Sequence, residues 1–231
     1  MEYRILGPLE VLGEDGPAPL PGGRARALLA VLVLHTGQVV STDRLIDQLW
    51  GAQAPATART KLHGLVSRLR RLLEPDWRSQ EESGTIRTRS PGYVLMADPE
   101  QIDAFHFRLL VERARDLPPA EKARLLRSAL DLWRGPPLAD FTYEQFAQVE
   151  IASLEELRLA AVEVLIAAQL ELGHHSILVP ELEGLVSLNP FREMLRAQWM
   201  LALYRSGNQR MNRPGICGGS DSTERWSDAS T

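Results

Sequence analysis

The spacing of apolar residues changes at Asp98-Pro99, and this change restricts the possible folds more than any other feature of the sequence. Before it, short alternating runs typical of strands are mixed with runs of helical spacing. After it, every periodic segment has the spacing of a helix. A chain of 231 residues has room for two small domains. The sequence therefore predicts a mainly α protein with a small β component, with one domain over 1–97 and a second over 98–207.

The first of these segments combines strands and helices in an informative order. The expected elements are strands over 3–6 and 9–12, helices from Arg24 to before Gly37, from the N-cap Ser41 to Gly51 and from near Pro55 to before Pro75, and a hairpin of strands 85–88 and 93–96. A short capped helix, a turn, a longer helix and a hairpin follow one another in a winged helix-turn-helix. We therefore expect an N-terminal domain of this type.

The second segment is expected to be entirely helical. Its helices are predicted near 103–117, 119–133, 143–172, 175–188 and 191–205. Gly173 and Gly207 lie 34 residues apart, as do Leu170 and Tyr204, and this is the period of tetratricopeptide repeats. The spacing predicts an all-α domain of tetratricopeptide-like helices, in which each of the two glycines ends a helix.

Residues 208–231 break this pattern, because they are rich in Gly, Ser, Asp and Arg and carry no helical stripe. An artificial end, a shifted reading frame and a natural disordered tail would each produce such a stretch, and these alternatives stay open. We expect an atypical tail, disordered or non-native, that takes no part in the fold.

Composition excludes several classes of protein. With 44% hydrophobic and 24% charged residues, the chain is not intrinsically disordered. It has no run of 18 apolar residues and does not begin like a secretory signal. The single cysteine, Cys217, cannot form an internal disulfide, and no cysteines and histidines have the spacing of zinc ligands. We expect a cytoplasmic protein with no membrane contact, no metal and no cofactor.

The five histidines are not arranged with a nucleophile or an acid–base partner. No catalytic residue is therefore expected, and the sequence does not indicate an enzyme.

Charge is distributed unevenly along the chain. Residues 1–97 hold 12 Lys and Arg against 10 Asp and Glu, whereas residues 98–231 hold 14 against 20. Placed on a helical wheel, the segment 59–74 has a leucine stripe on one side and an acid-free face on the other. That face and its flanks carry Thr60, Lys61, His63, Gly64, Ser67, Arg68 and Arg71. Such a helix fits the major groove of B-DNA, where Arg and Lys reach guanine acceptors or phosphates.

Two further features favour a DNA-reading helix over a merely solvated amphipathic one. Gly64 lies in mid-helix, where glycine costs about 1 kcal/mol relative to alanine, so its place on the outer face suggests a close approach. The hairpin carries Arg87 and Arg89, which a winged helix-turn-helix would lay along the DNA backbone or in the minor groove. Without these features, solvation alone would explain the arginines.

Several motifs resemble the Streptomyces antibiotic regulatory protein family. In the first domain they are STDRLIDQLWG at 41–51, VSRLRRLL at 66–73 and SPGY at 90–93; in the second they are LWRGPPLAD at 132–140, LEELRL at 154–159 and LALYRSG at 201–207. The resemblance spans roughly residues 3–207. It implies an OmpR-like winged-helix domain followed by a bacterial transcriptional activation domain.

The resemblance also implies a function and partners. Family members are pathway-specific transcriptional activators of antibiotic biosynthesis that bind double-stranded promoter DNA as tandem copies on direct repeats. They recruit RNA polymerase through its sigma and alpha subunits, so the chain would work at the nucleoid. By position, the seven outer residues would lie on the recognition helix, Arg87 and Arg89 on the wing, and the loop 51–55 where related activators meet polymerase. The rival interpretation is a helical-repeat scaffold for protein partners with little DNA binding.

Overall fold

The structure is a computed structural model and describes residues 1–74 and 84–211, with side chains described as far as residue 207. The chain forms two compact units, Met1–Leu172 and a second that begins at Gly173. The change of periodicity at Asp98-Pro99 therefore lies inside the first unit.

The N-terminal strands form a small antiparallel sheet, as the sequence predicts. It contains β1 (Glu2–Arg4), β2 (Glu10–Gly13) and β3 (Gly16–Pro17), in the order β1-β2-β3. Tyr3 lies opposite Val11 in the register of the first two strands. Both side chains are buried, so this face of the sheet covers the hydrophobic core.

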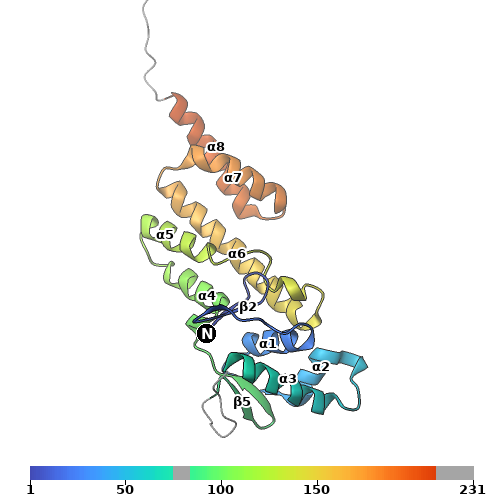
Figure 1. The fold of residues 1–231 in the computed structure, drawn as a ribbon. Helices are drawn as coiled ribbons and strands as arrows, with labels where there is room; N and C mark the ends of the chain where they lie inside the picture. The colour runs from blue at the N-terminus through green and yellow to red at the C-terminus, as the bar shows by residue number, and fades with distance from the viewer. Residues whose placement is uncertain (75–83, 212–231) are drawn as a thin grey trace, which may run out of the picture. The chain divides into compact units, whose positions relative to one another are not determined.

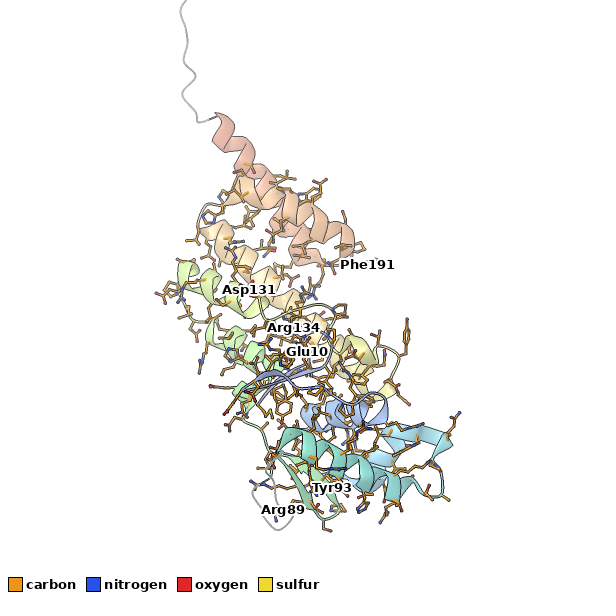
Figure 2. The ribbon with its side chains drawn as sticks, in the orientation of Figure 1. Glu10, Arg89, Tyr93, Asp131, Arg134 and Phe191 are labelled. Carbon is orange, nitrogen blue, oxygen red and sulfur yellow. The ribbon has the colours of Figure 1, made fainter. Side chains whose placement is uncertain are left out.

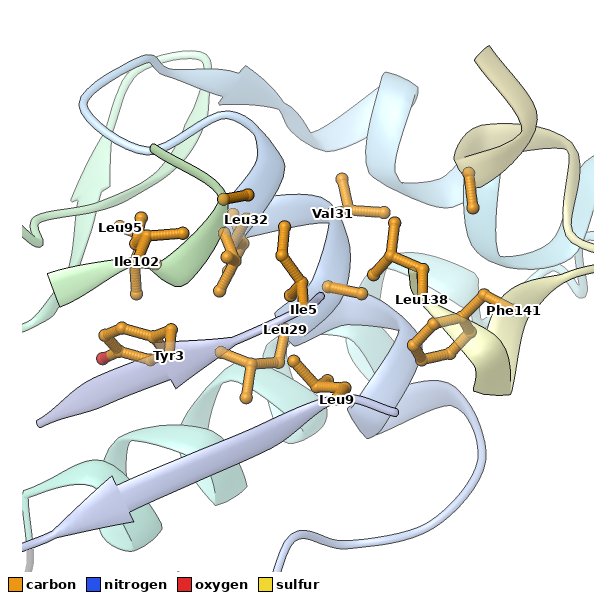
Figure 3. Close-up of a cluster of buried hydrophobic side chains, with 14 of the residues drawn as sticks. Tyr3, Ile5, Leu9, Leu29, Val31, Leu32, Leu95, Ile102, Leu138 and Phe141 are labelled. Atoms are coloured by element: carbon orange, nitrogen blue, oxygen red, sulfur yellow. The ribbon is translucent and has the colours of Figure 1, made fainter. Parts of the chain in front are cut away.

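Helix α1 (Arg24–Leu34) occupies the centre of that core. An unbroken run of its residues, from Leu28 to Val33, is buried, which explains why its sequence is apolar almost all round. Figure 3 shows Leu29, Val31 and Leu32 of this helix among side chains from the N-terminal strands and from later parts of the chain. The core is continuous across the first unit.

Helices α2 (Thr42–Trp50) and α3 (Ala58–Leu73) pack against each other and against α1. The predicted cap of α2 is confirmed, since Ser41 Oγ accepts a hydrogen bond from the Arg44 amide at 3.2 Å. A short 3-10 turn, η1 (Gly51–Gln53), follows α2. Figure 1 shows the three helices grouped at one end of the first unit. The helix-turn-helix order is therefore present.

The hairpin is also present and belongs to a three-stranded sheet. Strands β5 (Ile86–Arg89) and β6 (Gly92–Leu95) pair antiparallel, and β4 (Val40–Ser41) adds a third strand beside β6 that the sequence analysis did not predict. A Cβ atom on Gly92 would collide with the carbonyl oxygen of Val40. Glycine at this position therefore allows the wing to join the start of α2.

Three helices complete the first unit: α4 (Asp103–Arg113), α5 (Pro119–Leu130) and α6 (Gln145–Glu171). Short 3-10 turns, η2 (Pro99–Gln101) and η3 (Ala139–Phe141), precede α4 and α6. Helix α5 packs against both α4 and α6. Each helix lies within a segment that the periodicity predicts, although the observed helices are shorter than the predicted ones.

A cluster that we call the polar seam, formed by Asp103, Arg134 and Asp140, ties the N-terminal strands to the later helices. The Asp103 carboxylate accepts hydrogen bonds from the amides of Ile5 and Leu6 at 2.8 and 3.0 Å. The Asp140 carboxylate accepts one from the Leu9 amide at 2.8 Å and pairs with the Arg26 guanidinium at 2.9 Å.

The third member of the polar seam bonds through both its backbone and its side chain. The Arg134 amide donates to the Leu6 carbonyl at 2.8 Å, and its guanidinium pairs with Glu10 at 2.9 Å. Figure 2 shows Arg134 and Glu10 side by side. Backbone groups that the short strands leave unpaired are thus satisfied by residues more than 90 positions later in the chain.

The second unit contains α7 (His175–Leu188) packed against α8 (Glu193–Met211). Gly173 precedes α7 with a positive φ of 86°, as suits a glycine at a helix end. The corresponding expectation for Gly207 is wrong, because Gly207 lies inside α8. Residues 208–211, which the sequence analysis assigned to the tail, continue that helix; the remainder of the predicted tail lies outside the described residues.

Two properties of the described residues bear on function. None of their helices is both long enough and apolar enough to cross a membrane. Nor do three or more His, Cys, Asp or Glu side chains come together among them in a way that would hold a metal ion.

Candidate nucleic-acid interface

Helix α3 has two chemically different faces. Leu62, Val66 and Leu69 are buried in the core of the first unit. The seven residues that the sequence placed on the outer face are all exposed: Thr60, Lys61, His63, Gly64, Ser67, Arg68 and Arg71. We call this surface the recognition face. The leucine stripe therefore fixes the rotation of the helix and turns the cationic residues toward solvent.

The recognition face is positive because α3 contains no acidic residue and few acids approach it. Among the described parts of the chain, Lys61, Arg68 and Arg71 form no salt bridge. Arg71 Nε instead contacts the Ser67 carbonyl of the same helix at 3.4 Å. Arg59 differs, since it pairs with Asp43 of α2 at 3.0 Å. Three of the exposed cations are thus available to an anionic ligand.

Gly64 leaves the middle of the recognition face open. A Cβ atom built at this residue would meet nothing within 4 Å. Packing inside the chain therefore does not require glycine here, although glycine weakens the helix relative to alanine. A close approach from outside the chain would account for it.

His63 and Ser67 are held in defined positions on this face. The His63 ring meets the Tyr93 ring of β6 edge to face, with 6.0 Å between the ring centroids. Burial raises the pKa of the Tyr93 hydroxyl. Ser67 Oγ donates to the His63 carbonyl at 2.9 Å. Both residues remain exposed, so each keeps polar atoms directed at solvent.

The two wing arginines are not equivalent. Arg89 is exposed at the end of β5, where it lies opposite Gly92 in the register of the hairpin. Arg87 is half-buried, and its Nε donates to the Gly84 carbonyl at 3.1 Å. The structure therefore places Arg89 where a ligand can reach it and commits part of Arg87 to the hairpin itself.

Arg70 is a functional candidate that the sequence analysis did not single out. Its Nε donates to the Ile86 carbonyl and its Nη2 to Thr88 Oγ1, both at 2.9 Å. Burial lowers the pKa of its guanidinium. These bonds join α3 to β5 and so fix the wing relative to the recognition face. A possible signal was its position at the edge of the leucine stripe, but its partners are 16 and 18 residues away.

Comparisons with known proteins identify the family. Residues 21–95 match the family described as transcriptional regulatory protein, C terminal, and residues 102–211 match the bacterial transcriptional activator domain. The regulatory protein DnrI of Streptomyces peucetius is 36% identical over 217 residues, which cover 90% of this chain and 79% of DnrI. The chain belongs to the Streptomyces antibiotic regulatory protein family. It is a DNA-binding transcriptional activator, as the sequence predicts.

Two other relatives extend the comparison. The transcriptional regulator RedD of Streptomyces coelicolor is 34% identical over 212 residues, covering 90% of this chain and 61% of RedD. The solved structure of Mycobacterium tuberculosis EmbR in complex with a low-affinity phosphopeptide matches with a TM-score of 0.82 and 31% identity, over 91% of this chain and 56% of that one. The predicted fold class, a winged helix-turn-helix followed by helices, is thereby confirmed.

Proposed function

We propose that the chain activates transcription of a secondary-metabolite gene cluster by binding direct repeats beside a promoter through the recognition face and the wing. One observation carries the proposal: α3 turns an acid-free face to solvent on which Lys61, Arg68 and Arg71 have no salt-bridge partner among the described residues. A scaffold of helical repeats has no need of such a face. A protein that binds double-stranded DNA does need it, because the DNA phosphates attract unpaired cations.

The residues of the interface have separate roles in this proposal. Lys61, Arg68 and Arg71 neutralise phosphates or bond to guanine edges in the major groove. Thr60, His63, Gly64 and Ser67 shape the close contact, while Arg89, with Arg87 beside it, meets the DNA backbone or the minor groove. Arg70 positions the wing and does not itself touch DNA.

The remaining parts of the chain supply the contacts of an activator. Residues 1–97 form the DNA-binding domain, and residues 98–207 form the activation domain. The loop 51–55, exposed except at Pro55, contacts the sigma and alpha subunits of RNA polymerase. Tandem copies on adjacent half-sites raise one another's occupancy. The protein works in the cytoplasm at the nucleoid and catalyses no reaction.

Fluorescence anisotropy with DNA across a salt series tests the proposal. The probes are a duplex from the promoter region of the gene's own neighbourhood and a scrambled duplex of equal length. We expect tighter binding to the promoter duplex, with log affinity falling linearly with log salt by about 0.9 per neutralised phosphate. Absence of binding to either duplex at low salt would contradict the proposal and leave the helical scaffold as the better interpretation.

A charge-matched pair of variants sharpens the test. The double variant Arg68→Ala/Arg71→Ala removes two cations from the recognition face, whereas Arg113→Ala/Arg115→Ala removes two exposed cations at the end of α4. We expect only the first pair to reduce the salt slope, by about 2. Equal slopes for the two variants would show that binding follows net charge and not this face.

A further inference from the structure

A groove lies between α2 and the start of α6 in the first unit. It has a volume of about 790 Å³. One wall comes from the start of α6 and the two residues before it and carries three large apolar side chains; the other comes from α2 and carries three polar side chains. We call it the α2–α6 groove. Its main lining residues are Tyr143, Phe146 and Val149 on the apolar wall and Arg44, Asp47 and Gln48 on the polar wall.

The apolar wall presents large side chains to solvent. Tyr143 is 99% exposed and Val149 is 81% exposed, with the half-buried Phe146 between them in the sequence. Phe146 and Val149 are three residues apart in α6 and share one side of the helix, and Tyr143, two residues before α6, lines the same groove. Contiguous exposed apolar residues that are rimmed by polar ones are typical of protein-binding surfaces.

The polar residues of the groove, on both walls, offer acceptors and negative charge. Asp47 and Glu144, both exposed, form no salt bridge with another described residue. Gln48 Oε1 is buried and has no hydrogen-bond partner in the part of the chain that the structure describes. The one cation of the polar wall, Arg44, bonds through Nη2 to His35 Nε2 at 2.9 Å. An occupant with a cation and an apolar face would therefore suit the groove.

The second unit has a surface with the complementary chemistry. Met194, Ala197, Leu201 and Tyr204 follow one another at steps of three, four and three residues along α8, and all four are exposed. We call this row the α8 outer stripe. The stripe is turned away from the buried Leu195 and Ala202, so α8 has exposed as well as buried apolar side chains. Arg205, also exposed, stands at one end of the stripe.

We propose that the α8 outer stripe of one copy of this chain docks in the α2–α6 groove of the neighbouring copy on DNA. The inference rests on the proposed function, because direct repeats supply the neighbour. Apolar side chains of the stripe cover Tyr143 and Val149, and Arg205 meets Asp47 and Glu144. An amphipathic helix lying in a groove is a recurrent mode of protein recognition.

The two surfaces differ from each other, and this determines the symmetry of the contact. A contact between unlike surfaces is heterologous, so each copy uses its groove toward one neighbour and its stripe toward another. Such a contact needs no two-fold axis between neighbours, and half-sites in a direct repeat provide none. A contact that forms in free solution only at high protein concentration becomes effective when DNA supplies a high local concentration.

Cooperative binding to a two-site duplex tests the contact. Val149→Asp places a charge on the apolar wall of the groove, and Tyr204→Glu places one on the stripe, where Tyr204 is 69% exposed. The matched controls are Ala152→Asp, an exposed alanine of α6 that does not line the groove, and Leu203→Glu, an exposed leucine of α8 outside the stripe. Affinity for a duplex with one half-site and for a duplex with two is measured for each protein.

We expect all five proteins to bind a single half-site alike, because none of the substitutions touches the recognition face. On two half-sites, the groove and stripe variants should lose roughly tenfold in cooperativity, whereas the controls keep it. An equimolar mixture of the groove and stripe variants should recover part of the loss, because the intact groove of one can receive the intact stripe of the other. A symmetric contact would not show this recovery.

Several outcomes overturn the inference. They are undiminished cooperativity in Val149→Asp or Tyr204→Glu, no recovery in the mixture, and no cooperativity in the unmodified chain. Failure to bind even a single half-site is a failure of the proposed function instead. Sedimentation of the free chain at high concentration then decides the contact separately: the two variants must lower the average mass while their controls do not, and equal masses refute it.

Discussion

The polar seam and the recognition face use the same kinds of side chain in opposite ways. In the polar seam, Asp103 and Asp140 accept hydrogen bonds from backbone amides, and Arg134 pairs with Glu10. On the recognition face, Arg68 and Arg71 have no carboxylate partner among the described residues and stay in solvent. Charge that stabilises the fold is bonded within the chain, and charge that serves binding is left unpaired.

This difference predicts that substitutions in the polar seam change mainly the stability of the protein, whereas substitutions on the recognition face change mainly its affinity for DNA. Removing a charged group that is hydrogen-bonded within the fold leaves its partners without a bond, and this lowers the free energy of unfolding. Removing an unpaired surface charge leaves no partner without a bond and costs little stability. Substitutions in the two regions should therefore move different measurements, beginning with the polar seam, where the effect is largest.

Asp103→Ala should destabilise the protein by at least about 2 kcal/mol, because two buried amides lose their acceptor and each costs about 1–3 kcal/mol. Burial raises the pKa of this carboxyl group, while hydrogen bonds from Ile5 and Leu6 oppose the shift. Urea unfolding followed by circular dichroism measures the change, with the exposed Asp116→Ala as control. A cost equal to that of Asp116→Ala would show that the hydrogen bonds to Asp103 do not stabilise the fold.

Arg71→Ala should weaken binding to the promoter duplex by roughly tenfold, or about 1.4 kcal/mol, while the thermal midpoint hardly changes. Its side chain is exposed, and among the described residues it bonds only to a carbonyl of its own helix. Anisotropy and calorimetry of the same preparation give both numbers. A large fall in the thermal midpoint would mean that Arg71 packs within the fold and contributes to stability, as the residues of the polar seam do.

Gly64→Ala should move the two measurements in opposite directions. Alanine is favoured over glycine in a helix by up to about 1 kcal/mol, and the added methyl group meets nothing in the chain, so stability should rise. If DNA comes close to this position, affinity should fall several-fold. A variant that is more stable and binds DNA as tightly as the original would show that nothing approaches Gly64.

Arg59→Ala should have the smallest effect. The Arg59–Asp43 pair is exposed on both sides, and such pairs contribute about 0.5 kcal/mol or less. Because Asp43 already neutralises Arg59, we also expect no change in the salt slope of DNA binding. A slope reduced as much as that of Arg68→Ala would place Arg59 with the unpaired cations of the recognition face.

Local signals in the sequence were sufficient for most helices and for the outer face of α3. Ser41 was predicted as the cap of α2 from its type and position, and the leucine stripe fixed which side of α3 faces solvent. These features depend on neighbours a few residues away. Gly207 shows the limit of this reasoning, since a glycine near an expected helix end lies inside α8.

Features that depend on distant partners could not be predicted from the sequence. Nothing near Asp103 indicates that its carboxylate accepts bonds from residues 97 and 98 positions earlier. Strand β4 is two residues long and exists because Val40 and Ser41 pair with β6. The role of Arg70 likewise depends on its hydrogen bond to β5, and the half-buried position of Arg87 goes with its hydrogen bond to the Gly84 carbonyl. Long-range pairing has no periodic signature.

The polar seam has a practical consequence for anyone who dissects the chain. A fragment that ends at residue 97 looks complete by its motifs, yet it lacks the acceptors for the amides of Ile5, Leu6 and Leu9. It also lacks Ile102, Leu138 and Phe141, which lie in the same core as α1 (Figure 3). The smallest piece that can be exchanged between relatives as an independent module is therefore longer than the DNA-binding motif. In a chimera of two relatives joined at residue 97, the N-terminal strands of one protein would have to fit the later helices of the other.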